Sequence, residues 1–331
     1  MNQSEQEIAS LFDNMSLEYD CISDLWYSWL FSNLHFFISK DLLQTNAGQS
    51  DCCLDIGCGT GYQSLLFSMA GIKTEGIDIS PALINVASNK TIKTFIERPL
   101  FDAHFPFVEK LHAKTMANIS AVRNDRSLKE PIYRIASATA LPYANESFKY
   151  VNCIGSVISF IENYIQAITE IARVLKPDGY FFLEFENKYN IDLIWPLIDN
   201  ILLGKIGYEQ NWKTSFKNLF SDIRKHIKVE YPFTKQNEVV EMDIWLFNTG
   251  KMIRELKANG LNILSIRSIH SVTNLIPSVL LDDPKPGSLK KDVFSILASL
   301  ESKIHRMFPI NRLGCSTYIF GQKGSGTIQN F

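Results

Sequence analysis

The sequence LDIGCGTGYQS, at residues 54–64, is the strongest indication of the fold of this chain. The apolar run 51–56 predicts a β-strand, and residues 62–70 predict an α-helix that ends at Gly71. Between them, glycines at 57, 59 and 61 allow a tight turn and let the backbone approach a ligand closely. A strand that passes straight into a helix through such a turn is typical of doubly wound α/β proteins.

The same alternation of strands and helices continues along the chain. Ser80 precedes a proline and is the expected N-cap of a helix, as is Asn248 or Thr249 for a later one. Because alternating elements need crossover connections, we expect an α/β fold with a doubly wound, mostly parallel, seven-stranded Rossmann-like sheet. The other strands are expected at 73–77, 132–136, 148–154, 180–185, 261–267 and 316–321, and further helices at 161–175 and 249–259.

The chain divides into four expected parts. Residues 1–44 form an N-terminal helical lid with two helices, and 45–186 form a ligand-binding core. Residues 187–245 interrupt the alternation as a helical insertion that covers the substrate, and 246–331 complete the sheet. Within the core, a charged segment at about 97–130 shows no clean helical period and is interpreted as an insertion.

The apolar window 25–38 is too short and too polar for a bilayer span. It predicts an amphipathic helix that packs on the core, because its large residues fall near one helical face. These residues are Trp26, Trp29, Leu30, Asn33 and Phe37.

The glycine turn favours a particular kind of ligand. A dinucleotide site of the G-x-G-x-x-G type needs glycine at position 62, where this chain has Tyr62. Asp55 beside the turn is unfavourable for a phosphate and suits a ligand with an ammonium group, such as S-adenosylmethionine. At the end of the next strand, Asp78 can accept two hydrogen bonds from a ribose diol.

With these residues in place, the chain resembles the class I S-adenosylmethionine-dependent methyltransferases, of the kind that act on small molecules. LDIGCGTGYQS (54–64) looks like the first motif of the family and GIDIS (76–80) like the second. ASATALPYANESF (136–148) and LKPDGYFFLEF (175–185) look like later motifs, and FDNMSLEYD (12–20) resembles its N-terminal tyrosine-aspartate element. The resemblance implies S-adenosyl-L-methionine as cofactor.

The resemblance also implies roles for single residues. Gly57 and Gly59 would border the methionine moiety, Asp78 would hold the ribose, and Ile79 would pack on the adenine. Ser137 and Ala138 would line the adenine edge, Gly155 would lie under the methyl group, and Tyr19 over the cofactor. The full expected cofactor set is Tyr19, Asp55, Gly57, Cys58, Gly59, Gly61, Tyr62, Asp78, Ile79, Ser137, Ala138 and Gly155.

Three positions depart from the family pattern. Ser137 and Lys149 stand where the family usually has aspartate, and no histidine follows the fourth strand, where the chain reads Gly155-Ser-Val-Ile-Ser-Phe160. The last departure removes the obvious general base. His270, just after the expected sixth parallel strand, is therefore the candidate base, with a solvated loop histidine as the alternative. Glu186, Asn187 and Tyr189 could orient an acceptor, and His226 is interpreted as a surface residue.

The insertion indicates the kind of acceptor. Its many apolar residues suggest a small or medium-sized, partly apolar methyl acceptor in specialised metabolism. The alternative is that these residues only attach the insertion to the core. O-methylation of a hydroxyl or carboxylate is favoured, with N- or C-methylation as alternatives. The apolar residues are Trp195, Leu197, Ile198, Ile201, Leu202, Leu203, Trp212, Phe216 and Phe220.

Composition excludes several other classes of protein. The 331 residues are 46% hydrophobic and carry a net charge of -2, so neither disorder nor a general field for nucleic acid is expected. The polar, acidic N-terminus lacks a secretory signal, and six cysteines without a C-x-x-C pair predict neither a disulfide framework nor a metal site. We expect a cytoplasmic location and no transmembrane segment. The remaining alternatives are a methyltransferase-like protein that binds the cofactor without turnover, and a nicotinamide-dependent oxidoreductase.

Overall fold

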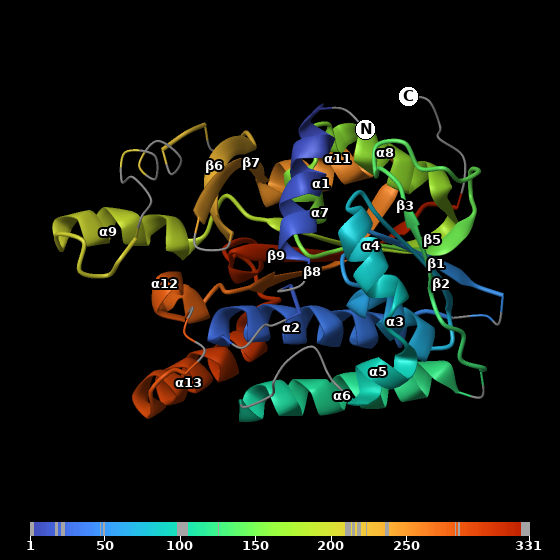
Figure 1. The fold of residues 1–331 in the computed structure, drawn as a ribbon, viewed down its shortest axis with the longest axis horizontal. Coiled ribbons are helices and arrows are strands. Elements are labelled where there is room, and N and C mark those ends of the chain that lie inside the picture. Colours follow the sequence, from blue (N-terminus) through green and yellow to red (C-terminus); the bar gives the residue numbers. More distant parts are fainter. Residues whose placement is uncertain are drawn as a thin grey trace.

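A seven-stranded sheet forms the centre of the protein in a computed structural model (Figure 1). Its strand order is β3-β2-β1-β4-β5-β9-β8. The strands are β1 (Cys52–Ile56), β2 (Lys73–Asp78), β3 (Ile132–Ile135), β4 (Phe148–Cys153), β5 (Leu175–Glu186), β8 (Leu261–Ile269) and β9 (Ser316–Lys323). The structure describes residues 3–16, 19–20, 24–46, 48, 50–97, 105–124, 126–208, 213, 216, 220–222, 224–235, 238–281, 283 and 285–325.

The pairing of the strands confirms the expected mostly parallel sheet. β1 pairs in parallel with β2 and β4, β2 pairs in parallel with β3, and β4 pairs in parallel with β5. β9 runs antiparallel between β5 and β8, so β8 has the same direction as β5. The carboxyl ends of six strands therefore meet at one edge of the sheet, where α/β proteins bind ligands.

Helices cover both faces of the sheet (Figure 1). α2 (Leu25–Leu42), α3 (Tyr62–Met69), α6 (Pro106–Arg123) and α13 (Ser288–Ile304) share one hydrophobic core with Tyr150 of β4. α8 (Tyr164–Val174) and α11 (Thr249–Ala258) share the other core with the next residue, Val151. The strands are apolar on both faces, as expected of a covered parallel sheet.

The helix α2 packs on the core as expected, but it is buried on nearly every side and is therefore not amphipathic. Its outer side is covered by α6, which lies in the segment that was interpreted as an insertion without a helical period. The buried residues of α6 do follow a helical spacing, at Val108, Leu111, Thr115, Ile119 and Val122. α2 is also joined to the sheet by a buried ion pair, in which Arg267 of β8 donates to both oxygens of Asp41.

The starts of two helices agree with the capping residues expected from the sequence. The Ser80 hydroxyl accepts from Leu83 N at the start of α4 (Pro81–Ser88), and Asn248 accepts from Lys251 N at the start of α11. The helix expected at 161–175 is α8, which begins at Tyr164 because the side chain of Asn163 caps it there. A short helix that was not expected, α7 (Val157–Phe160), precedes it. β5 begins at Leu175, earlier than expected.

The two expected N-terminal helices are α1 (Gln3–Met15) and α2. α1 contacts α4, because Asp13 Oδ1 accepts hydrogen bonds from the hydroxyl of Ser80 and from Ala82 N. This contact places α1 near the carboxyl ends of the strands. Four short helices complete this part of the description: α5 (Ile92–Glu97), η2 (Thr273–Leu275), α12 (Ser278–Leu281) and η3 (Ile310–Arg312).

The segment 187–245 contains a β-hairpin as well as helices. η1 (Ile191–Ile194) and α9 (Trp195–Ile201) are followed by β6 (Ile227–Lys235) and β7 (Glu238–Leu246), and β7 packs against α7. Several of its apolar side chains are exposed, including Ile201 at 77%, Leu203 at 87% and Phe220 at 71%. These residues therefore do not attach the insertion to the core; Trp212 lies outside the described residues.

Candidate active site

A cavity lies at the carboxyl ends of β1, β2 and β4. It encloses about 1080 Å³, part of which is open solvent. Its walls come from one face of α1, the turn after β1, the end of β2, the loop after β3 and the segment after β4. The lining residues that the sequence predicted are Tyr19, Gly57, Cys58, Gly59, Tyr62, Asp78, Ile79, Ser137, Ala138 and Gly155.

The turn after β1 needs glycine for two different steric reasons. Gly57 has a φ of +66°, and a Cβ there would lie 2.3 Å from Cγ2 of Val157. Gly61 has a φ of +89°, and its Cβ would lie 2.4 Å from the hydroxyl of Tyr133. Gly61 is not among the lining residues, so its part is to let Tyr133 approach the turn. Gly57 therefore belongs to the cavity wall, and Gly61 supports the turn from behind.

Asp78 joins the turn to the end of β2. Its Oδ2 accepts from Gly59 N at 2.9 Å, and its Oδ1 accepts from Ser80 N at 2.9 Å. Burial raises the pKa of Asp78 above its usual range, while the backbone N–H groups of Ser80 and Gly59 oppose this shift. Each carboxylate oxygen has a second lone pair that can accept from a ligand hydroxyl.

Asp55 lies behind the cavity and not in its wall. Its side chain accepts from the hydroxyl of Ser64 and from Asn152 Nδ2 at 2.7 Å, and it is 1% exposed. Burial raises the pKa of Asp55 to about 6, although the bonds from Ser64 and Asn152 oppose the shift. The expected direct contact with an ammonium group is not supported by this position. Asp55 instead connects β1 with β4 and α3.

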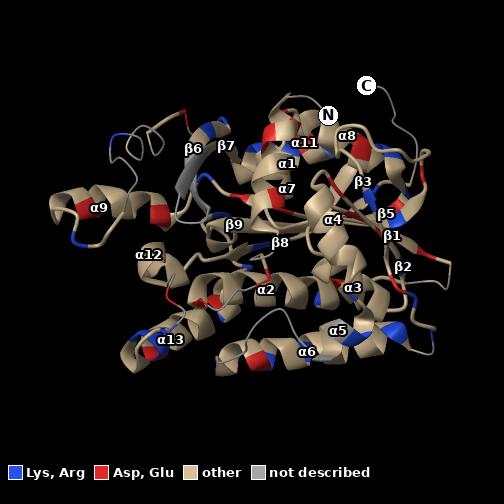
Figure 2. Cartoon of the chain, viewed as in Figure 1, with Lys and Arg blue, Asp and Glu red and all other residues tan. Residues whose placement is uncertain are grey.

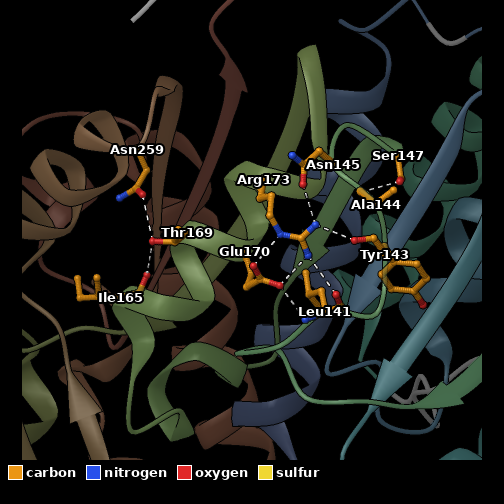
Figure 3. Close-up of polar contacts among 10 residues, drawn as sticks. All are labelled: Leu141, Tyr143, Ala144, Asn145, Ser147, Ile165, Thr169, Glu170, Arg173 and Asn259. Carbon is orange, nitrogen blue, oxygen red and sulfur yellow. Dashed lines mark hydrogen bonds and ion pairs between the residues drawn. The ribbon is translucent and has the colours of Figure 1, made fainter. Parts of the chain in front are cut away.

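The loop after β3, which carries Ser137 and Ala138, is held by α8 (Figure 3). Glu170 accepts from Leu141 N at 2.8 Å, and Arg173 donates to the carbonyl oxygens of Tyr143 and Leu141. The bond from Arg173 lowers the pKa of Glu170. This network fixes the loop from its rear side. On the cavity side, the hydroxyl of Ser137 donates to Glu5 of α1.

Tyr19, which was expected to lie over the cofactor, lies next to the turn after β1 and lines the cavity. Its ring is 3.8 Å from the position a Cβ on Gly59 would take. The neighbouring Asp20 accepts from the hydroxyl of Thr60 at 2.6 Å and pairs with Lys90, whose Nζ also donates to the carbonyl oxygen of Thr60. Burial and the nearby carboxylate of Asp78 raise the pKa of Tyr19 well above its usual range. The hydroxyl therefore stays protonated at neutral pH.

Two carboxylates lie at the end of β5, the buried Glu184 and the half-buried Glu186. Glu184 accepts from Gly155 N and Ser156 N, and Glu186 accepts from the hydroxyl of Ser156 at 2.6 Å. Burial and the charge of Glu184 raise the pKa of Glu186 to about 8. These bonds hold the backbone at Gly155, where nothing lies within 4 Å of the missing Cβ because the residue faces the cavity.

His270, the candidate base, is buried away from the cavity, and the alternative of a solvated loop histidine is also wrong. It is 0% exposed, with Nδ1 bonded to the hydroxyl of Thr273 at 2.8 Å and Nε2 to the carbonyl oxygen of Trp26 at 3.1 Å. Its ring stacks on that of Trp26 with centroids 4.4 Å apart. Burial lowers the pKa of His270 to about 4. Both ring nitrogens are therefore engaged inside the protein.

Two other residues differ from their sequence interpretation. His226 is buried and not on the surface: its Nε2 lies 2.9 Å from Glu255 Oε2, and its Nδ1 accepts from Asn248 N. Asn187 does not face an acceptor, because its Nδ2 donates to the carbonyl oxygens of Tyr189, Arg312 and Gly314. His226 thus connects the start of β6 to α11, and Asn187 connects the end of β5 to the segment before β9.

Several lining residues were not predicted from the sequence. Glu5, Ile8 and Phe12 face the cavity from α1, at a spacing of three and four residues that a helical face produces. This spacing was the available signal, but it does not show which element the face packs against. The other unpredicted lining residues are Phe31, Ile56, Thr60, Gln63, Leu83, Ala136, Thr139, Ile154, Val157, Phe160, Ile161, Glu162 and Asn163.

The described residues show no arrangement that could hold a metal ion and no helix that is long and apolar enough to cross a membrane. Basic and acidic residues are interspersed over this part of the chain (Figure 2).

The cavity fits a nucleoside with an amino-acid tail. Asp78 offers a carboxylate at the end of β2, the glycine turn lets the backbone come close, and Gly155 leaves open space. A doubly wound sheet with such a cavity defines a nucleoside-binding α/β protein. The model of a methyltransferase-domain family matches residues 30–266. The chain belongs to this family and is an S-adenosylmethionine-dependent methyltransferase.

The chain is also similar to individual known proteins. An uncharacterised protein of Methanocaldococcus jannaschii is 26% identical over 242 residues, which are 72% of this chain and 74% of that protein. A demethylmenaquinone methyltransferase of Staphylococcus haemolyticus is 25% identical over 54% of this chain and 60% of its own length. Among solved structures, a SAM-dependent methyltransferase of Methanosarcina mazei aligns with a TM-score of 0.46 and 16% identity, over 86% of this chain and 98% of that one.

Proposed function

We propose that the chain transfers the methyl group of S-adenosylmethionine to a small or medium-sized, partly apolar acceptor, and that the acceptor atom is an oxygen. The observation that carries this proposal is the apolar wall next to Gly155. Phe12, Val157, Phe160 and Ile161 line the cavity there, and the rings of Phe12 and Phe160 meet edge to face at 5.3 Å. Pockets with such walls bind apolar compounds and orient them through a few polar groups.

The proposed position of the cofactor follows from the polar residues. Asp78 accepts from the ribose hydroxyls, Ile79 packs on the adenine, and Ser137 and Ala138 line its edge. The methionine moiety runs along Gly57 and Gly59 under Tyr19, toward Gly155. The bound cofactor supplies a methyl group that is already activated by the sulfonium. The chain has to align the acceptor with it and exclude water, which lowers the barrier by several kcal/mol.

The segment 187–245 supports the acceptor wall from behind. Leu193, Val229, Ile244 and Leu246 form a small hydrophobic cluster of the insertion, and Phe160 packs against it. No described residue of the insertion lines the cavity. We therefore propose that the insertion acts on the acceptor through α7, by fixing Phe160, and not by covering the cavity directly.

The lining groups favour an acceptor that ionises on its own. No histidine is found among the described lining residues. Of the lining carboxylates, Glu162 accepts from Lys228 at 2.6 Å, Asp78 is held by backbone N–H groups, and Glu5 by two hydroxyls. A carboxylate or an acidic hydroxyl needs no strong base for methyl transfer. A quinol-like hydroxyl belongs to this class and is a suitable compound to test.

The test is a transfer assay with methyl-labelled cofactor against phenols, quinols, aromatic and aliphatic carboxylates, amines and RNA. We expect labelled ethers or esters. Label found only in amines or RNA would contradict the proposed acceptor. Phe160→Ala should raise the acceptor KM about tenfold, since a buried aromatic contact is lost, and leave the cofactor Kd unchanged. Phe220→Ala, an exposed phenylalanine outside the cavity wall, is the matched control.

We also propose a cytoplasmic location. Cysteines 52, 53, 58, 153 and 315 are free thiols, which is typical of a reducing compartment.

A further inference from the structure

Glu5 of α1 lies at the end of the cavity where the adenine is proposed to bind. The hydroxyl of Ser137 and the hydroxyl of Thr139 both donate to the same oxygen of Glu5, Oε1, the latter at 3.0 Å. All three residues line the cavity. A carboxylate brought by the N-terminal helix is therefore attached to the loop after β3, on the side that faces a ligand.

The adenine ring presents an exocyclic amino group, which needs a hydrogen-bond acceptor. Ser137 is poorly suited to this, because its hydroxyl donates to Glu5 and its oxygen accepts from Thr139 N at 3.2 Å. The other lining carboxylates are occupied elsewhere, Asp78 at the end of β2 and Glu162 with Lys228. A carboxylate has about four acceptor positions, and the hydroxyls of Ser137 and Thr139 both bond to one oxygen of Glu5, Oε1.

We propose that Glu5 accepts a hydrogen bond from the adenine amino group and so takes over a role that the loop after β3 cannot fill with Ser137. This inference rests on the proposed position of the cofactor. Ser137 and Thr139 are positioning residues, because they orient the carboxylate and do not supply the acceptor atom. A bond from an amino group to a charged oxygen is about twice as strong as one between neutral groups.

The rest of α1 keeps Glu5 in place. Ile8 and Phe12 follow on the same helical face and line the same cavity. Near the end of the helix, Asp13 Oδ1 accepts from the hydroxyl of Ser80 and from Ala82 N at 3.0 Å, at the start of α4. Glu5 is thus fixed from two sides, by Asp13 along its own helix and by the hydroxyls of the loop. Recognition of the adenine ring is therefore coupled to the packing of α1 against α4 and the loop after β3.

The test compares two ligands that differ only at the base. S-adenosyl-L-homocysteine carries the 6-amino group, and S-inosyl-L-homocysteine carries a 6-oxo group that cannot donate from that atom. By calorimetry we expect the wild-type protein to bind the adenosyl compound at least tenfold more tightly. In Glu5→Gln, the amide oxygen can still accept from Ser137 and Thr139, while the amide nitrogen can donate to the 6-oxo group. The preference should therefore fall about tenfold or reverse.

The matched control is Glu7→Gln on the same helix, where the carboxylate is exposed and outside the cavity wall. It should keep the wild-type preference. If Glu5→Gln weakens both ligands equally, Glu5 only attaches α1 and the inference is overturned. A wrong position of the cofactor gives a different result, because Asp78→Ala would then leave the affinity for S-adenosyl-L-homocysteine unchanged.

Discussion

The backbone N–H of Gly59 donates a hydrogen bond of 2.9 Å to Oδ2 of Asp78, which connects the turn after β1 with the end of β2. Ser80 N holds the other carboxylate oxygen at 2.9 Å. The carboxylate is thereby oriented before a ligand arrives, and little rotamer entropy is lost on binding. The ends of β1 and β2 are thus joined at the oriented carboxylate of Asp78.

Asp78→Ala should weaken binding of S-adenosyl-L-homocysteine about 100-fold. Two hydrogen bonds from ribose hydroxyls to a charged oxygen contribute roughly 1.5–3 kcal/mol each before coupling, and each 1.4 kcal/mol is about tenfold. The measurement is calorimetry, with circular dichroism to verify the fold. Asp243→Ala on the hairpin, a half-exposed carboxylate away from the cavity wall, is the control. An unchanged Kd in Asp78→Ala would show that the ribose binds elsewhere.

Gly61→Ala should destabilise the fold by about 1–3 kcal/mol, since a φ of +89° is strained for alanine and the Cβ would lie 2.4 Å from the Tyr133 hydroxyl. Adding Tyr133→Phe removes the clashing oxygen and should restore part of the loss, as measured by denaturant unfolding. Gly324→Ala should change little, because its nearest atom would be 3.5 Å away. Equal stability of Gly61→Ala and wild type would contradict the steric account of this turn.

His270→Gln should reduce stability and leave turnover nearly unchanged. The side chain is fully buried and bonded to Thr273 and Trp26, so its replacement costs about 1–3 kcal/mol at pH 7.5. kcat should stay within about twofold, because the ring does not face the cavity. A 100-fold loss of kcat at unchanged stability would instead identify His270 as the base.

The same histidine gives the fold a pH dependence. Its pKa is lowered from 6.5 to about 4 in the folded protein, so the unfolded chain takes up the proton first as the pH falls. The neutral ring's contribution is present above pH 6.5 and is lost between pH 6.5 and 4, by roughly 3 kcal/mol. The stability difference between wild type and His270→Gln should therefore shrink as the pH falls from 7.5 to 5. A difference independent of pH would contradict the lowered pKa.

Glu186→Gln should stabilise the protein more at high pH than at low pH. The folded-state pKa of Glu186 is raised from 4.5 to about 8, so ionisation opposes folding as the pH rises through this window. Glutamine cannot ionise and can still accept from the Ser156 hydroxyl. Thermal unfolding at pH 5 and pH 8.5 measures the effect, with exposed Glu109→Gln as control. A gain that is equal at both pH values would show that Glu186 is not held protonated.

The cofactor side of the fold could be predicted because local chemistry determines it. A glycine turn between an apolar strand and a helix has few possible conformations, and Ser80-Pro81 starts a helix by capping and by a fixed φ. The positions of the strands could be predicted from continuous runs of apolar residues. These signals lie within a few residues of one another and do not depend on distant contacts.

The rest depended on contacts between distant segments. The burial of α2 could not be inferred from its own sequence, because α6 covers it from 106–123. His270 looked like a base from its position after a strand, but Trp26 and Thr273 take both ring nitrogens. Glu5 gave no signal of its own, since its partner loop lies more than a hundred residues along the chain.

The position of α1 has a consequence for the rate of ligand exchange. Glu5, Ile8 and Phe12 form one wall of the cavity, and Asp13 fastens the helix to the start of α4. Because these side chains line the cavity, we expect the residence time of the spent nucleoside to depend on the free energy with which α1 docks. Under saturating conditions, release of the demethylated product would then set the turnover number. Removing the hydrogen bonds of Asp13 to Ser80 and Ala82 would make the enzyme faster, and the enzyme would bind S-adenosylmethionine less tightly.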